Sequence, residues 1–233
     1  MFVKKVLCVL AVIAGIGSAG LRAGDVAAYV DLGFSPDGKI YMFAQYGVQS
    51  ETLKPWADLF VVDVVKNDFV SGGKYSYIHD SPVAAGQDGS GALYRVIARH
   101  GALAAAYRVN FLFQGKPLYI APEAPDSLYN DTLEFRDFES GFSYKAALVS
   151  TIERRGAAMV SSFYINLERT GGDGSTKFFT LGDPQMKRPR ISSYKIRKVM
   201  IAPHDGSMIF VIEMKKQDGS DVNIRFMVEA LHL

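Results

Sequence analysis

Residues 32–43 read Leu-Gly-Phe-Ser-Pro-Asp-Gly-Lys-Ile-Tyr-Met-Phe, and this stretch indicates how the chain folds. Apolar residues stand on both sides of a turn signal. Proline presets φ for the first corner of a turn, and glycine accepts the positive φ that a later corner often needs. We therefore predict that Pro36, Asp37 and Gly38 form a structural turn between strands over 28–34 and 39–45.

Strand patterns continue along most of the chain. Side chains of residues 159–168 alternate between apolar and polar, and with 144–153 they predict a long hairpin. Further strands are expected over 59–65, 194–201, 208–214 and 222–228. Residues 90–107 have helical spacing of apolar side chains, with Ser90 as the expected cap. The predicted fold class is mainly β (α+β), with antiparallel sheets and one or two helices.

A second turn near the C-terminal end repeats part of the first. Residues 202–207 read Ala-Pro-His-Asp-Gly-Ser, so we expect Pro203, Asp205 and Gly206 to be structural turn residues as well. With their flanking strands, both hairpins resemble the blade motif of TolB-type β-propellers, which implies blade-like hairpins near both ends. No intervening position repeats Pro-Asp-Gly, and a predicted helix interrupts the period. The pattern favours two similar hairpins over a closed propeller.

The N-terminal segment has the order of a secretory signal peptide. Two lysines precede a short apolar run, and small residues follow it up to Ala23. The run is shorter than the roughly 20 residues that a membrane anchor needs. We predict a signal peptide over 1–23 and one domain over 24–233, with cleavage after Ala19 or Gly20 as alternatives. The mature chain should be exported, periplasmic or secreted, soluble and without a transmembrane segment.

The signal peptide carries three basic residues and the one cysteine, Cys8. Its removal takes the formal net charge from +2 to −1 and leaves no thiol. The mature composition excludes a strongly basic nucleic-acid binder, and export makes a nucleic-acid partner unexpected.

The whole layout is similar to that of a bacterial family of predicted secreted proteins of unknown function. The similarity covers the signal peptide, the leader strand into Gly-Phe-Ser-x-Asp-Gly, the Tyr-Gly-Val at 46–48 and an aromatic-acidic strand, and its specific residues cluster in 30–63. The resemblance implies export, and it carries no known activity or catalytic residue.

One run of charge is a candidate binding site. Six basic residues occur in twelve positions without an acid among them: Lys187, Arg188, Arg190, Lys195, Arg197 and Lys198. On a chain of net charge near −1, such a patch could recruit an anionic surface polymer or an acidic face of an envelope protein. The alternative is an edge strand that its charges keep solvated.

Signals for catalysis are weak. The four histidines lack metal-ligand spacing, and no nucleophile elbow or phosphate loop occurs, so we expect no metal and no cofactor. Three nearby carboxylates, Glu134, Asp137 and Glu139, leave open a hydrolase, because glycoside hydrolysis needs two acids. The predicted function is a non-enzymatic envelope or periplasmic module that binds a protein or surface polymer. The alternative is an extracytoplasmic hydrolase that uses Asp and Glu.

Overall fold

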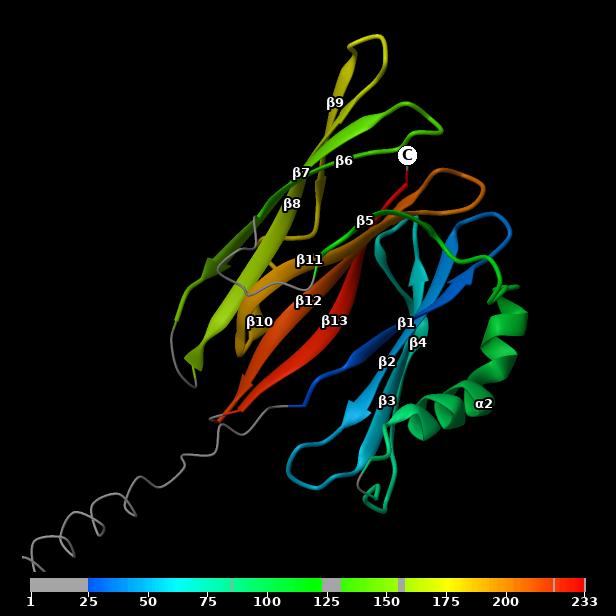
Figure 1. Ribbon diagram of the computed structural model, residues 1–233, viewed down its shortest axis with the longest axis vertical. Helices are drawn as coiled ribbons and strands as arrows, with labels where there is room; N and C mark the ends of the chain where they lie inside the picture. The colour runs from blue at the N-terminus through cyan, green and yellow to red at the C-terminus, as the bar shows by residue number, and fades with distance from the viewer. Residues whose placement is uncertain (1–24, 85, 123–130, 155–157, 220, 233) are drawn as a thin grey trace, which may run out of the picture.

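The computed structural model describes residues 25–84, 86–122, 131–154, 158–219 and 221–232 (Figure 1). The predicted signal peptide over 1–23 lies outside these ranges. The described residues form thirteen strands in three antiparallel sheets, with one helix. The predicted mainly β class is therefore confirmed. Within the same ranges, no helix has the length and apolar content needed to cross a membrane.

The first sheet is a meander in the order β1-β2-β3-β4. Its strands are β1 (Ala28–Phe34), β2 (Ile40–Val48), β3 (Pro55–Asp63) and β4 (Asp68–Ile78). The middle sheet has the order β13-β12-β11-β5. Its strands are β5 (Lys116–Ile120), β11 (Ile191–Ile201), β12 (Met208–Asp218) and β13 (Asp221–Leu231).

The third sheet is built around the predicted long hairpin, β7 (Ser143–Ile152) and β8 (Val160–Thr170). β6 (Thr132–Arg136) pairs with the outer edge of β7. β9 (Thr176–Leu181) and the short β10 (Arg188–Pro189) both pair with β8, at opposite ends of that strand.

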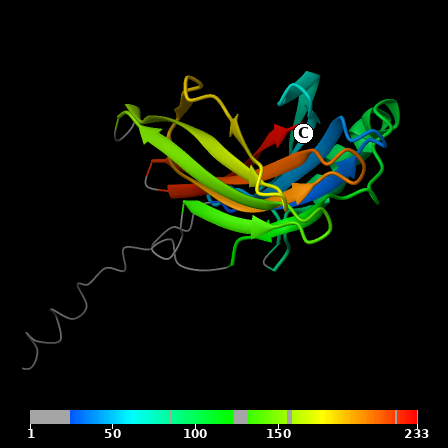
Figure 2. The same cartoon turned by 90° about the horizontal axis from the view of Figure 1, so that it is seen from above.

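Side-chain alternation stacks these elements into layers. On β12, Met208 and Phe210 enter the core shared with the third sheet, whereas Ile209 and Val211 enter the core shared with the first sheet. On β2, Tyr41 lies in that second core, and the alternate residues pack under the helix α2 (Ser90–Ala106). The order is third sheet, middle sheet, first sheet and α2, and the helix lies at the outside in both views (Figure 1, Figure 2).

The helix begins differently from the prediction. Its N-cap is Gly89, and no side chain caps it, so the expected Ser90 cap is wrong. The Asp88 carboxylate instead accepts hydrogen bonds from the Ser90 backbone N–H at 3.0 Å and the Ser90 hydroxyl at 2.6 Å. The helix is also kinked at His100, whose φ of −117° and ψ of 17° are not helical.

The resemblance to propeller blades does not extend to the architecture, because the described residues form no closed propeller. Local turn chemistry explains the shared letters. Asp37 accepts a hydrogen bond from the Ser35 hydroxyl, and Asp205 accepts one from the Ser207 hydroxyl. Gly38 and Gly206 have φ of +72° and +75°. The two hairpins lie in facing sheets, and their turns touch, since a Cβ on Gly38 would lie 2.6 Å from Asp205 Cγ.

Because of this contact, substitution of the two glycines should cost different amounts of stability, although their φ values are nearly the same. Gly206→Ala should cost only the left-handed strain, about 1–2 kcal/mol, because nothing lies within 4 Å of its Cβ position. Gly38→Ala should cost about 2–3 kcal/mol, since Asp205 must also move away from Ser207. Urea denaturation of both variants measures the difference. Equal losses would mean that the two turns do not touch in solution.

Candidate functional site

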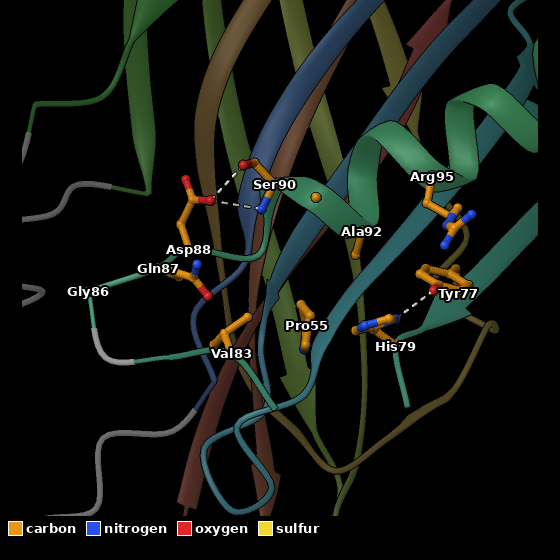
Figure 3. A pocket seen from close by; sticks show the side chains of 11 residues that line it. Pro55, Tyr77, His79, Val83, Gly86, Gln87, Asp88, Ser90, Ala92 and Arg95 are labelled. Atoms are coloured by element: carbon orange, nitrogen blue, oxygen red, sulfur yellow. Dashed lines mark hydrogen bonds between the residues drawn. The ribbon is translucent and has the colours of Figure 1, made fainter. Parts of the chain in front are cut away.

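One candidate site is a pocket of about 610 Å³ between the first sheet and the beginning of α2 (Figure 3). This volume lies within the roughly 300–1,000 Å³ typical of small-molecule sites. Pro55 at the start of β3, the end of β4, the loop that follows β4 and the first two turns of α2 supply the walls. Segments that are distant in sequence therefore meet around one cavity.

The strand wall presents an aromatic pair. Tyr77 and His79 are two residues apart, so the pleat directs both side chains to the same face. The Tyr77 hydroxyl and His79 Nδ1 are 2.9 Å apart and share a hydrogen bond, and Figure 3 shows the two rings at the same end of the pocket. The His79 backbone N–H donates to the Pro55 carbonyl at 2.9 Å, which fixes this wall to β3.

A close backbone approach holds the loop wall. A Cβ on Gly89 would lie 2.2 Å from the Gly47 carbonyl oxygen, so only glycine lets the loop lie against β2. The Val83 backbone N–H also donates to the Leu53 carbonyl at 2.9 Å. Together these contacts set the position of Asp88 at the mouth of the pocket.

The pocket has an acidic end and a basic end. Hydrogen bonds from the Ser90 side chain and backbone lower the pKa of Asp88, so this carboxylate is ionised at neutral pH. Arg95 lies at the opposite end, next to Tyr77 (Figure 3). Within the described ranges, no ion pair joins Arg95 to a carboxylate. Between the two ends, Pro55, Val83 and Ala92 give the cavity an apolar floor.

The six residues of the predicted basic cluster do not form one open patch, and three of them pair with acids. Lys187 pairs with Glu153, Arg190 with Asp218 at 2.9 Å, and Arg197 with Glu213 at 3.3 Å. These acids come from sequence-distant strands and turns. The ion pairs reduce the positive field that the cluster presents to a partner.

The other three basic residues are less accessible than an open patch requires. Lys195 is only 7% exposed. The Lys198 ammonium lies 3.9 Å from the partly buried Asp31 carboxylate. Arg188 lies over the Phe163 ring and 3.7 Å from Glu229. The role of the cluster as a surface for anionic partners stays a prediction. The solvated-edge alternative fits only in part, because β11 lies between β12 and β5 and Lys195 is nearly buried.

The carboxylates of the hydrolase alternative do not share a cleft. Lys116 lies 2.8 Å from both Asp137 and Glu139. Hydrogen bonds from Lys116 and Ser140 outweigh desolvation and lower the pKa of Asp137 to about 2. A general acid needs the opposite shift. Glu134 lies elsewhere, on the exposed face of the third sheet, 3.8 Å from Lys145.

Sequence reasoning named Ser90 only as a helix cap and gave the other residues that line this pocket no role. Tyr77 lies near the end of β4 and His79 lies just after it. Arg95 is one of several polar residues on an amphipathic helix. A usable signal was the Asp88-Gly89-Ser90 sequence just before the helix, because an acid at that position is typical of a helix start.

Comparison with known proteins gives one family. A family model described as "Predicted secreted protein (DUF2259)" matches residues 42–232. Neither a curated protein nor a solved structure matches the chain.

Proposed function

Because the chain belongs to this family of predicted secreted proteins, whose function is unknown, we propose that it is exported and acts as a non-enzymatic binding module. Its binding site is the pocket between β4 and α2, and the ligand is part of an envelope protein or surface polymer. The observation that carries the proposal is the Arg95 guanidinium on the wall of a 610 Å³ cavity, where no carboxylate of the described residues pairs with it.

Binding suits this pocket better than catalysis does. Acid–base chemistry needs a group whose pKa lies near the working pH. The Asp88 pKa is shifted downward, and Nδ1 of His79 already shares a hydrogen bond with the Tyr77 hydroxyl. The pocket offers directed hydrogen-bonding groups on an apolar floor, which is the usual composition of a ligand site. The hydrolase alternative has less support, because Lys116 keeps Asp137 ionised.

Gly91 allows the pocket to be filled without disturbing its walls. It lies on α2 and lines the cavity, and nothing lies within 4 Å of its Cβ position. Gly91→Phe should therefore fill the cavity, and it should not weaken the helix, since glycine is the poorer helix former. We expect the variant to lose binding while its melting temperature is unchanged or higher.

The test uses a panel of three probes: tri-alanine, tri-N-acetylglucosamine and glycerol phosphate. Saturation-transfer NMR and calorimetry should find at least one probe that binds the mature protein and not Gly91→Phe. Gly101→Phe is the matched control, because Gly101 lies on the same helix with open space at its Cβ and does not line the pocket. If no probe binds, or if both variants bind alike, the pocket is not the site.

A further inference from the structure

We infer that the pocket binds a short zwitterionic peptide of about three residues, with its free carboxylate on Arg95 and its free amine on Asp88. This inference rests on the proposed binding role of the pocket, and it narrows the ligand to a free peptide released from an envelope protein or surface polymer. Two opposite charges at the ends of one cavity, separated by an apolar floor, select a ligand with the same arrangement.

The basic end suits a carboxylate. A guanidinium binds a carboxylate through two parallel hydrogen bonds, and these charge-assisted bonds are the strong ones. The guanidinium of Arg99, one turn further along the helix, lies 4.6 Å from the centre of the Tyr77 ring. Its charge adds to the positive potential at this end of the pocket.

The acidic end suits an amine. Asp88 stays ionised because Ser90 donates two hydrogen bonds to its Oδ1. Within the described residues its other carboxylate oxygen accepts no hydrogen bond, so that oxygen is available to a ligand donor. The Asp88 charge also offsets the positive N-terminal end of α2, which would otherwise attract an anion. An anionic group therefore prefers Arg95, and a cationic group prefers Asp88.

The separation of the ends sets the length of the ligand. Asp88 lies two residues before the first residue of α2, and Arg95 lies in its second turn. A separation of seven residues corresponds to roughly 10 Å at the rise of a helix. An extended peptide covers the same distance in about three residues. The floor of Pro55, Val83 and Ala92 has no charge, so it accommodates small apolar side chains between the two ends.

Uncharged and purely anionic ligands fit less well. A neutral sugar would cover both charges without compensating either, and burial of an unpaired charge is unfavourable. A polyanion would place negative groups against Asp88, and that repulsion would lower its affinity. The inference therefore separates peptides from the other two members of the probe panel.

The experiment measures tri-alanine binding to the mature protein by calorimetry at pH 7 and low salt. Capping either terminus, by N-acetylation or by C-terminal amidation, should weaken binding about tenfold or more, as the loss of a charge-assisted hydrogen bond does. Arg95→Gln should weaken binding of the free peptide and leave binding of the amidated peptide unchanged. Asp88→Asn should weaken binding of the free peptide and leave binding of the acetylated peptide unchanged.

Matched controls separate the pocket from general charge effects. Arg154→Gln removes an exposed base near the end of β7, and it should not change binding. Asp173→Asn removes an acid that accepts a backbone hydrogen bond from Ser175 at 2.9 Å, just as Asp88 does from Ser90, but far from the pocket. Asparagine keeps the Oδ1 acceptor at both positions, so the local turns should persist.

The outcomes distinguish the two proposals. If tri-alanine fails to bind, or capped and free peptides bind equally, the zwitterion inference is overturned. If another probe then binds and Gly91→Phe abolishes its binding, the binding-module proposal stands without the inference. If no probe is sensitive to Gly91→Phe, both fail.

Discussion

Gly33→Ala should destabilise the protein by about 3 kcal/mol or more, which is the largest effect that we expect from removing a single glycine. Gly33 has a φ of +97°, and its Cβ would lie 2.3 Å from the Asn110 carbonyl oxygen. That oxygen belongs to a segment fixed on β1, because the Asn110 backbone N–H donates to the Phe34 carbonyl at 3.0 Å. Neither β1 nor the segment around Asn110 can move away without breaking this hydrogen bond.

Gly72→Ala is the matched control for that prediction. Gly72 also has a left-handed φ, +66°, but nothing lies within 4 Å of its Cβ position. Its substitution should cost only the conformational strain, about 1–2 kcal/mol. Urea denaturation curves give both free energies of unfolding. If the two variants lose the same stability, the approach of Asn110 to β1 contributes nothing and the first prediction fails.

Local patterns were enough to predict most of the β structure. Alternation over 159–168 and 144–153 identified β7 and β8, because a strand with one face in a core must alternate. The turn chemistry around Gly38 identified the β1–β2 hairpin. By contrast, β9 was missed, because its sequence Thr-Lys-Phe-Phe-Thr-Leu does not alternate cleanly. Its pairing with β8 is what makes it a strand.

The candidate site was beyond sequence reasoning for a different reason. Tyr77 and Arg95 become neighbours only after β4 and α2 pack together, and nothing in their separate patterns predicts this. The basic run around 187–198 was more visible in the sequence, yet its charges meet Glu153, Glu213 and Asp218 in the fold. A run of like charge therefore says little about the surface field until its partners are known.

A polar contact holds the first sheet against the middle sheet. Asn67, in the turn between β3 and β4, has a left-handed φ of 50°. Its side-chain amide donates to Glu229 Oε2 on β13 at 2.6 Å, and its side-chain oxygen accepts from the Ala230 backbone N–H at 2.6 Å. Glu229 is only 5% exposed, and Arg188 is its nearest cation. Asn67 therefore satisfies two buried groups at once.

Asn67→Ala should cost about 3 kcal/mol at pH 8, since it leaves the Glu229 carboxylate and the Ala230 N–H without this partner. Asn166→Ala, which removes a 3.4 Å hydrogen bond from Thr180 on an exposed strand face, should cost about 0.5 kcal/mol or less.

The Asn67→Ala loss should also depend on pH. Burial raises the pKa of Glu229 above the ordinary value of 4.5, and the hydrogen bond from Asn67 opposes that rise. A raised carboxyl pKa favours the folded state below the unfolded pKa, and this contribution disappears as pH rises through the folded pKa. Removing Asn67 raises the folded pKa further, so the loss at pH 8 should shrink as pH falls toward 4.5. Urea denaturation at several pH values measures this trend, and a loss that stays constant would show that Asn67 does not stabilise the ionised Glu229.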